Sequence, residues 1–290
     1  MINQRVTLAR PATTGARLNE DEVLTAYDTQ VRRDTTPPIP TWVVDDLGRI
    51  IRATAPATGR TGAFIGWNDF AGVDSETVDG LIEEQVAYFV QLGRRSEWKH
   101  YDHDRPTDLS DRLVAAGLRR DEPEALVVGD VEGVLQACRR AGPTEGVRVR
   151  LATIPDDLPA IAELHGAVWS TDSAWLADEL EQEKAGRPDD LEIFVAEDAT
   201  TGALMCSAWV RFQPGTDFAG LWGGTTHPDW RRRGAYRALV AARGELAAAR
   251  GVRYLQVDAS PESEPILQRL GLIRLATTTP HVWDPGSVDS

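Results

Sequence analysis

Cysteine is scarce in this chain of 290 residues, where Cys138 and Cys206 are the only two. Each lies in an apolar segment, VLQACRR and LMCSAWV, where a buried small thiol is the ordinary outcome. We therefore expect neither a disulfide nor a catalytic cysteine. The 42% apolar residues and nine tryptophans supply enough apolar surface to fold without such cross-links.

Long hydrophobic runs and excess positive charge are also missing. The first residues, MINQRVTLAR, lack the apolar region of a secretory signal, and no run approaches the roughly 18 apolar residues that span a bilayer. We therefore expect a cytoplasmic protein with no membrane partner. A formal net charge of −14 argues against a nucleic-acid partner, because such binding needs clustered Lys and Arg to neutralise phosphates. The acidic surface suits a small cationic or neutral substrate. The sequence does not decide between a monomer and a homodimer.

The length of the chain fits two domains of ordinary size. Helix- and strand-breaking residues are concentrated at Ala141-Gly142-Pro143-Thr144-Glu145-Gly146, between a helical pattern and an alternating one. We place a linker there, which gives one domain at residues 1–141 and a second at residues 147–290.

The second half alternates between strand and helix patterns. A strand at 147–152 is followed by a helix from about Pro155 and by a second helix, SAWLADELEQEKA. The runs at 192–197 and 203–212 predict a hairpin, and the strand FAGLWGGTTH leads into a long helix over 235–249. The strand VRYLQVD, the helix ESEPILQRL and two final strands, LIRLAT and PHVWD, complete a mixed sheet with helices packed on it.

The first half repeats this plan. The segment WVVDDLGRIIRAT has the strand, acidic turn, glycine and strand of FVAEDATTGALMCSAWV. The segment GLIEEQVAYFVQLGRRSEWKHYD, with DLSDRLVAAGL behind it, matches ALVAARGELAAARGVRYLQVD followed by SEPILQRLGL. The two halves therefore look like copies of one fold.

Positive charge is concentrated at the junction GLWGGTTHPDWRRRGAYRALV, between a strand and the long helix. The first N–H groups of a helix have no partner within it and, with the helix dipole, attract anions. Gly234 removes the Cβ that would hold a phosphate away, and Arg231, Arg232 and Arg233 precede it. The alternative is a solvated basic helix start, but arginine there opposes the dipole and needs a reason. The junction therefore predicts a diphosphate site.

This junction, the order of the elements and the closing SPESEPILQRLGL resemble the GNAT superfamily of N-acetyltransferases. The pyrophosphate signature of that family is Arg or Gln, any two residues, Gly, any residue, then Gly or Ala. Here it reads Arg231-Arg232-Arg233-Gly234-Ala235-Tyr236, so Tyr236 departs from it. The resemblance covers the second half and, weakly, the first. It implies an α/β fold (an α+β mixed sheet) of two tandem GNAT-like domains, each a mixed, splayed β-sheet flanked by helices.

The resemblance also implies ligands and their contacts. The acyl donor is acetyl-CoA, no metal is required, and the acceptor is a primary amine. Backbone groups of Thr225 and Thr226 hold the pantetheine and polarise the thioester carbonyl, and Gly223-Gly224 fits the bulge that opens the sheet. The implied cofactor-binding residues are Thr225, Thr226, His227, Arg231, Arg232, Arg233, Gly234, Ala235, Tyr236, Ser260 and Ser263.

Acyl transfer to an amine requires a neutral nucleophile, donors for the oxyanion and a proton for the departing thiolate. We expect the oxyanion donor at the backbone N–H near Thr226. The family often places a tyrosine acid four residues before the glycine of the last helix, but here that residue is Leu267. Tyr254, Tyr236 or water is left to protonate the sulfur.

The general base is equally open. The histone-acetylating branch of the family keeps a glutamate where this chain has Gly220. Each charged residue within reach of the cleft also has an ordinary explanation as a turn, cap or solvated charge; these residues are Asp217, His227, Asp258 and Glu262. We retain Asp258 as a catalytic candidate beside deprotonation through water, and expect Trp222 near the acceptor.

The first half lacks the anion site. Its copy of the junction, GWNDFAGVDSETVDG, carries acids that would repel a pyrophosphate, namely Asp69, Asp74, Glu76 and Asp79. A cluster of possible metal ligands precedes Pro106, where turn and cap roles are usual; it comprises His100, Asp102, His103 and Asp104. We expect no metal there. Core packing is the expected role of Trp67, Trp98 and Trp209.

Together these features predict an acetyl-CoA-dependent N-acetyltransferase with a catalytic second domain and a degenerate first domain that shapes the acceptor pocket. One alternative is a tandem acetyltransferase of the mycothiol-synthase kind, although no motif demands that acceptor. The other is a non-catalytic acyl-CoA-binding or interaction protein, which the missing tyrosine and glutamate favour.

Overall fold

The computed structural model describes residues 18–34, 41–57 and 60–287. Its helices are α1 (Glu20–Tyr27), η1 (Asp28–Arg33, a π-helix), α2 (Ser75–Leu92), α3 (Leu109–Ala115), α4 (Val131–Arg140), α5 (Leu158–Trp169), α6 (Trp175–Gly186), η2 (Pro228–Trp230, 3₁₀), α7 (Ala235–Ala249), α8 (Glu264–Arg269) and η3 (Pro285–Ser287, 3₁₀). Its strands are β1 (Val43–Asp46), β2 (Ile50–Thr54), β3 (Thr61–Asn68), β4 (Arg95–Tyr101), β5 (Arg119–Arg120), β6 (Glu124–Asp130), β7 (Val147–Leu151), β8 (Leu191–Asp198), β9 (Leu204–Phe212), β10 (Phe218–Thr226), β11 (Tyr254–Ala259) and β12 (Ile273–Trp283).

All described strands belong to one 12-stranded sheet, ordered β1-β2-β3-β4-β12-β6-β11-β10-β9-β8-β7, with β5 paired to β12. The predicted repeat is confirmed in detail: β1 and β2 form the first hairpin, and α2, β4 and α3 follow in the first half as α7, β11 and α8 follow in the second. The fold is the mixed α/β arrangement that the sequence predicts.

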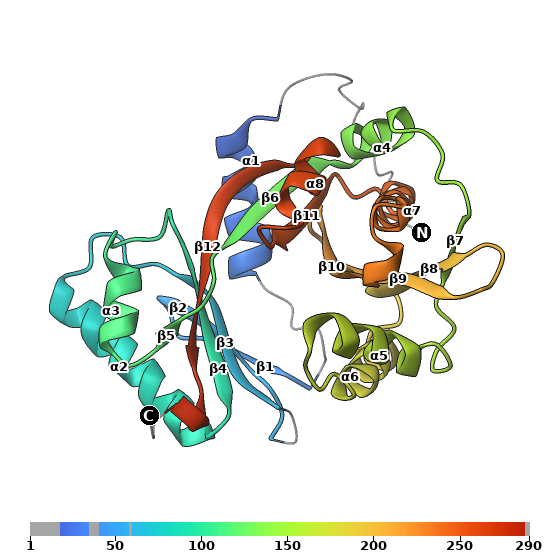
Figure 1. The fold of residues 1–290 in the computed structure, drawn as a ribbon. Coiled ribbons are helices and arrows are strands. Elements are labelled where there is room, and N and C mark those ends of the chain that lie inside the picture. Colours follow the sequence, from blue (N-terminus) through green and yellow to red (C-terminus); the bar gives the residue numbers. More distant parts are fainter. Residues whose placement is uncertain (1–17, 35–40, 58–59, 288–290) are drawn as a thin grey trace, which may run out of the picture.

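The two halves exchange their last strands, which the sequence did not indicate. The strand after α3 is β6, and it pairs with β11 of the second half, Tyr254 lying opposite Asp130. The strand after α8 is β12, and its outer part pairs with β4 of the first half, Thr278 lying opposite Tyr101. Figure 1 shows β12 running from one half into the other. The boundary at 141–147 stays a prediction, and β6 and α4, which precede it along the chain, pack with the second half.

The two final strands predicted as LIRLAT and PHVWD are one strand, β12, so this prediction was wrong. Pro280 lies within this strand although it cannot donate to a ladder. The pairing of β12 with β6 ends at Thr278, and beyond that point the strand pairs with β4 and, at His281 and Val282, with β5. The backbone oxygen of Pro280 accepts from Asp121 N–H at 2.9 Å, so only its donor is lost.

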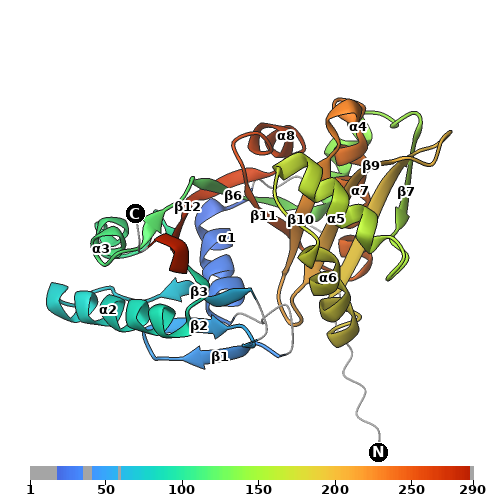
Figure 2. The ribbon, with the colours of Figure 1, turned by 60° about the horizontal axis from the view of Figure 1, so that its bottom comes forward.

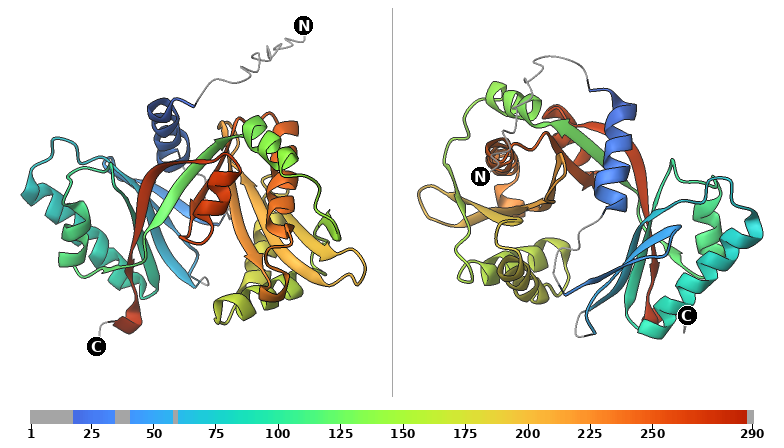
Figure 3. Two further views of the ribbon diagram at one scale, coloured as in Figure 1. Left: turned by 45° about the horizontal axis from the view of Figure 1, so that its top comes forward. Right: turned by 180° about the vertical axis from the view of Figure 1, so that it is seen from behind.

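Helices cover both faces of the second half's sheet, as Figures 2 and 3 show. One face packs against α4 and α7 through a core that includes Leu135, Leu239 and Leu255. The other packs against α5 and α6 through Ile161 and Trp209. In the first half α2 and α3 cover the sheet, and Trp98 is fully buried beneath them. The core role predicted for Trp98 and Trp209 is thus confirmed.

The N-terminal helical segment α1–η1 ties the halves together. Tyr27 packs edge-on against Phe218, with ring centroids 5.8 Å apart. Gln30 Nε2 donates to Asp217 Oδ2 at 3.2 Å, and Gln30 Oε1 accepts from the backbone of Asp217 at 2.7 Å. Arg32 is buried against β4 and pairs with Asp104 at 2.8 Å. Asp217, one of the charges considered for catalysis, is therefore engaged with this helix.

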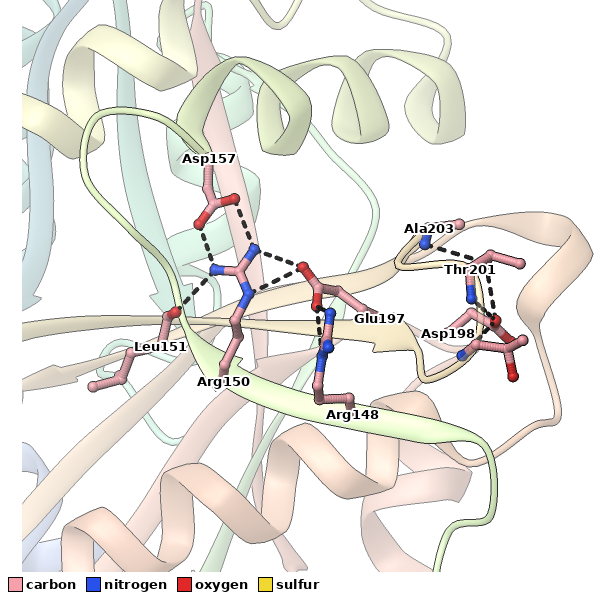
Figure 4. A network of polar contacts seen from close by, with 9 residues as sticks. Arg148, Arg150, Leu151, Asp157, Glu197, Asp198, Thr201 and Ala203 are labelled. Carbon is pink, nitrogen blue, oxygen red and sulfur yellow. Dashed lines mark hydrogen bonds and ion pairs between the residues drawn. The ribbon is translucent and has the colours of Figure 1, made fainter.

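An ion-pair network fixes the start of α5 against the edge of the sheet (Figure 4). Arg150 on β7 donates to Glu197 on β8 and to Asp157, both at 2.6 Å, and Arg148 donates to the other oxygen of Glu197 at 2.7 Å. Asp157 also accepts from the backbone of Thr153 at 2.6 Å. Because Asp157 immediately precedes α5, this network sets where that helix begins and thus where its later turns meet β10.

Candidate active site

A cavity of about 1830 Å³ opens between the two halves. Residues from η1, β2, β3 and β4 line one side, and residues from α5, β10, β11 and the start of α7 line the other. The predicted site residues that line it are Trp222, Thr225, Thr226, Arg231, Arg232, Gly234, Ala235, Tyr236, Asp258, Ser260 and Ser263. Three predicted residues are not in its lining: His227, Arg233 and Tyr254.

The loop before α7 contains two residues in the left-handed backbone region. Arg232 has φ of 64° and Gly234 has φ of 85°, both in the left-handed region. A Cβ on Gly234 would lie 2.8 Å from Thr144 Cγ2, so a larger residue there would displace the Thr144 side chain as well as strain the backbone. No side chain caps α7, and the backbone N–H groups of Ala235, Tyr236 and Arg237 donate to no described residue. These free N–H groups face outward at the positive end of the helix dipole.

Five arginines line the cavity without forming an ion pair to any residue that the structure describes: Arg231, Arg232, Arg237, Arg243 and Arg269. Among the described residues, the Arg237 side chain donates only to Thr144 Oγ1, at 3.2 Å. Arg233 differs, because its guanidinium lies 4.6 Å above the ring of Trp230 and outside the cavity lining. Arg237 and Arg269 were not predicted from the sequence. The spacing of Arg237, three residues after Gly234, was a readable signal, whereas Arg269 enters the site only through the packing of α8.

Two parallel strands separate at the centre of the cavity. β10 pairs with β11 only from Phe218 to Gly220, opposite Tyr254 to Gln256, and the described strands diverge beyond that point. The β9–β10 register shifts between Trp222 and Thr225, which is the predicted bulge at Gly223-Gly224. Backbone groups of β10 are thereby left without a strand partner on the side that faces β11, as a splayed sheet requires.

Aromatic rings explain both bulge glycines. Gly223 has φ of 62°, and a Cβ on it would collide with the ring of Trp209. A Cβ on Gly224 would lie 2.5 Å from the ring of Tyr236. The tyrosine that departs from the family signature therefore turns its ring toward the bulge, and burial raises the pKa of its hydroxyl above the usual range.

The two threonines after the bulge are held by side chains. Thr225 is buried, and its Oγ1 accepts from Trp169 Nε1 at 3.3 Å and contacts His165 Nδ1 at 3.4 Å. Burial lowers the pKa of the His165 imidazole to about 4, although the Gly223 backbone partly offsets this. Thr226 Oγ1 lies 3.1 Å from Cys206 Sγ, and burial raises the pKa of that thiol to about 11. His165 was missed because nothing in its local sequence shows that α5 meets β10.

Asp258 lies on β11 just beyond the point where the strands separate. Its Oδ2 pairs with Lys99 Nζ at 2.9 Å, and Lys99 also pairs with Glu124 at 3.2 Å. Its Oδ1 is buried without a hydrogen-bond partner among the described residues. Burial opposes the charge on Lys99, but Asp258 and Glu124 outweigh it and raise the pKa of the amine above its usual range. Burial raises the pKa of Glu124 as well.

Several other predicted residues are placed plainly. Trp222 is 43% exposed and lies over Gly220, where a Cβ would be 2.5 Å from its Nε1. The guanidinium of Arg211 lies 4.9 Å from the Trp222 ring. Tyr254 is buried against Phe218, so its position gives no support to a role as general acid. His227, which was predicted to bind the cofactor, lies outside the cavity lining and accepts from the backbone N–H of Asp229 at 3.3 Å, at the start of η2.

The last helix presents no hydroxyl from the expected position. Leu267 is fully buried in the core, and the side chains of α8 that line the cavity are Ile266 and Arg269. Ser263 precedes this helix and donates through Oγ to the backbone of Ser260 at 3.2 Å. Glu262, the remaining charged candidate, lies at the cavity beside Ser260, 3.4 Å from its Oγ.

The first half has a different helix start. Asp74 caps α2 by accepting from Thr77 N–H at 2.9 Å, which occupies the position that a phosphate would need.

His103, in the segment considered for metal binding, lies 2.9 Å from Asp28. Among the described residues no group of three or more His, Cys, Asp or Glu side chains is placed to hold a metal ion. None of the helices in the described ranges combines the length and apolarity needed to cross a membrane.

Comparison with known proteins gives the fold. A scan against protein-family profiles and a search of curated proteins returned no match. A GCN5-related N-acetyltransferase from Kribbella flavida has a TM-score of 0.64 at 16% identity, covering 94% of this chain and 98% of its own. A tandem GNAT protein from the clavulanic acid biosynthesis pathway has a TM-score of 0.61 at 14% identity, covering 93% and 97%. A GCN5-related N-acetyltransferase from Sphaerobacter thermophilus gives 0.55 at 16%, covering 91% and 85%. The chain has the fold of tandem GCN5-related N-acetyltransferases, as its sequence predicted.

Proposed function

We propose that this protein is an acetyl-CoA-dependent N-acetyltransferase that moves an acetyl group to a primary amine of a small molecule. Residues 147–290 bind the donor and carry the reaction. Residues 1–141 bind no cofactor and supply the opposite wall of the acceptor cavity. This division follows the basic start of α7 in one repeat and the acidic, Asp74-capped start of α2 in the other.

One observation carries the proposal: free N–H groups and unpaired arginines meet at the start of α7. The N–H groups of Ala235, Tyr236 and Arg237 are unused, and Arg231 and Arg232 have no carboxylate partner among the described residues, in a chain with a net charge of −14. Unpaired cations in so acidic a chain are expected to bind an anion. A diphosphate fits, because Gly234 brings the backbone within reach and the splayed strands lie next in the cavity.

The reaction needs few groups from the protein. Acetyl-CoA supplies the acetyl group as a thioester. The amine nitrogen bonds to the acetyl carbon as the carbon–sulfur bond breaks with its electron pair on sulfur, and the proton lost by nitrogen ends on the thiol. Backbone N–H groups of β10 near Thr226 stabilise the charge that develops on the carbonyl oxygen. Asp258 lines the cavity beside the separated strands and places a negative charge near the amine, whose deprotonation proceeds through water.

A non-catalytic acyl-CoA binder is the second candidate. It is favoured by the side chains of α8. Ile266 lines the cavity and Leu267 is buried in the core, so this helix supplies no tyrosine to protonate the departing thiolate. The two candidates share donor binding and differ in turnover.

A thiol-release assay separates them. Purified full-length protein is mixed with acetyl-CoA and a panel of mono-, di- and polyamines, and free thiol is measured with a chromogenic disulfide while mass spectrometry detects acetylated amines. The proposal expects amine-dependent thiol release with a matching acetylated product. Acetyl-CoA binding without product from any amine supports the non-catalytic candidate instead.

A further inference from the structure

A buried arginine without a counter-ion lies behind the bulge of β10. Arg243, on α7, is only 1% exposed. Its Nε donates to the carbonyl oxygen of Leu239 at 3.0 Å, and its Nη1 donates to those of Trp209 at 3.2 Å and Trp222 at 3.4 Å. Its Nη2 is buried and has no hydrogen-bond partner among the described residues. Arg243 also contributes to the cavity lining.

The charge on Arg243 is uncompensated within the described chain. No carboxylate forms an ion pair with it, and its titratable neighbours are the Tyr236 hydroxyl, which lies within hydrogen-bonding reach, and the Cys206 thiol. Burial raises the pKa of the Cys206 thiol to about 11 and raises the pKa of the Tyr236 hydroxyl, so both neighbours are neutral at physiological pH. Burial also lowers the pKa of Arg243, but a guanidinium keeps its proton in proteins. An unpaired buried charge is costly, and it is rarely retained without a functional reason.

The position of the guanidinium relates this charge to the reaction. Trp222 and Trp209 are paired residues at the start of the register shift, and Gly223 follows in the left-handed region. By holding the carbonyl oxygens of Trp222 and Trp209 on the α7 side, Arg243 fixes the orientation of the peptide groups at the bulge. The N–H groups that follow are those proposed to stabilise the thioester oxygen.

We propose that Arg243 is a positioning residue for acetyl transfer, which fixes the β10 bulge and places an unneutralised positive charge behind the thioester. This inference rests on the proposed function and deepens it. A preorganised charge in a water-poor site stabilises negative charge that develops in the transition state. The thioester oxygen and the departing sulfur both gain such charge. Arg243 thereby lowers the need for a proton donor at the position where the chain has Leu267.

The test compares Arg243→Met, which keeps the bulk of the side chain without its charge, with Arg243→Lys, which keeps the charge without the planar fork. Glu245→Gln, an exposed change on the same helix, is the control. With full-length protein and the best amine from the panel, Arg243→Met is expected to lower kcat about 100-fold while KM for acetyl-CoA and the Kd for coenzyme A stay within about twofold. Arg243→Lys is expected to restore about a tenth or more of the wild-type kcat, and Glu245→Gln is expected to match wild type.

A second readout reports the charge itself. The thiolate absorbance of bound coenzyme A is followed against pH, and wild type is expected to show a bound-thiol pKa below that of free coenzyme A, a shift that Arg243→Met removes. The bound-thiol pKa of wild type tests the inference even if Arg243→Met fails to fold. An unshifted bound-thiol pKa, or a Met variant with wild-type kcat, overturns the inference while leaving the proposed function intact. Absence of coenzyme A binding to wild type removes the proposed function and this inference together.

Discussion

Lys99 on β4 and Asp258 on β11 form an ion pair of 2.9 Å in the wall of the cavity, although one belongs to the first half of the chain and the other to the second. The pair exists because the halves exchange their last strands, which brings β4 and β11 to either side of β12 and β6. Lys99 also contacts Glu124, so one buried cation holds two carboxylates that line the cavity. The first half is thus part of the site rather than an appendage.

Removing this cation is predicted to destabilise the protein strongly. Lys99→Met leaves the largely buried carboxylate of Asp258 without a counter-charge, which costs about 3–5 kcal/mol of unfolding free energy, whereas Glu124 is about a third exposed and adds less. The measurement is urea unfolding at pH 7, arranged as a double-mutant cycle with Asp258→Leu. The double variant is expected to lose less than the sum of the two single variants, because each single variant strands the other partner. Simple additivity would show that the two residues do not interact.

Gly223→Ala is predicted to damage both the bulge and the activity. Gly202→Ala is the matched control, because Gly202 also has positive φ, at 75°, but has open space where a Cβ would stand. The control is expected to lose about 1 kcal/mol from backbone strain alone. Gly223→Ala is expected to lose about 1–3 kcal/mol more through the collision with Trp209. Denaturant unfolding measures the loss of unfolding free energy in each variant. Equal losses in the two variants would mean that Trp209 does not pack on the bulge.

His165 is predicted to remain neutral well below the pH at which an ordinary histidine titrates. Its pKa in the folded protein is lowered from 6.5 to about 4, so protonation favours the unfolded chain. Its contribution to stability is complete above pH 6.5 and falls as the pH drops toward 4, by about 2 kcal/mol at pH 5. Unfolding of wild type and His165→Gln at pH 7 and pH 5 measures the difference.

An NMR titration of the imidazoles measures the pKa of His165 directly. His103 serves as the internal comparison, because its hydrogen bond to Asp28 outweighs burial and raises its pKa above 6.5. The resonances of His165 are expected to shift at lower pH than those of His103. The reverse order would refute the buried environment described for His165.

Tyr254→Phe is predicted to leave turnover nearly unchanged. The Tyr254 side chain lies outside the cavity lining, packed 5.1 Å from the ring of Phe218. Tyr236→Phe, which removes a hydroxyl beside the bulge, is expected to have the larger effect on kcat. A general acid contributes about 100-fold or more, so a loss of that size in Tyr254→Phe would restore it as the proton donor. Steady-state rates of both variants, measured across pH, decide between them.

The features that could be predicted from the sequence are those set by residues close together along the chain. The hairpin turns, the glycine at the start of α7 and the arginines beside it are set by neighbours along the chain, so they could be read directly. The exchange of β6 and β12 could not, because a strand's apolar pattern does not say which edge it will join. Lys99 and His165 were missed for the same reason, since their contacts come from elements far apart in sequence. Tyr254 alternates onto the same face as Asp258, but its ring is covered by Phe218 and Tyr27.

The most direct test of the account is calorimetric titration of coenzyme A into wild type, Arg232→Glu and Arg233→Glu. The two variants make the same charge change at adjacent exposed positions, but only Arg232 lines the cavity, whereas Arg233 lies over Trp230. We predict that wild type and Arg233→Glu bind coenzyme A with similar affinity and that Arg232→Glu binds at least about tenfold more weakly, a loss of about 1.4 kcal/mol. Equal weakening by both variants, or no binding to wild type at millimolar coenzyme A, would contradict a diphosphate site at the start of α7.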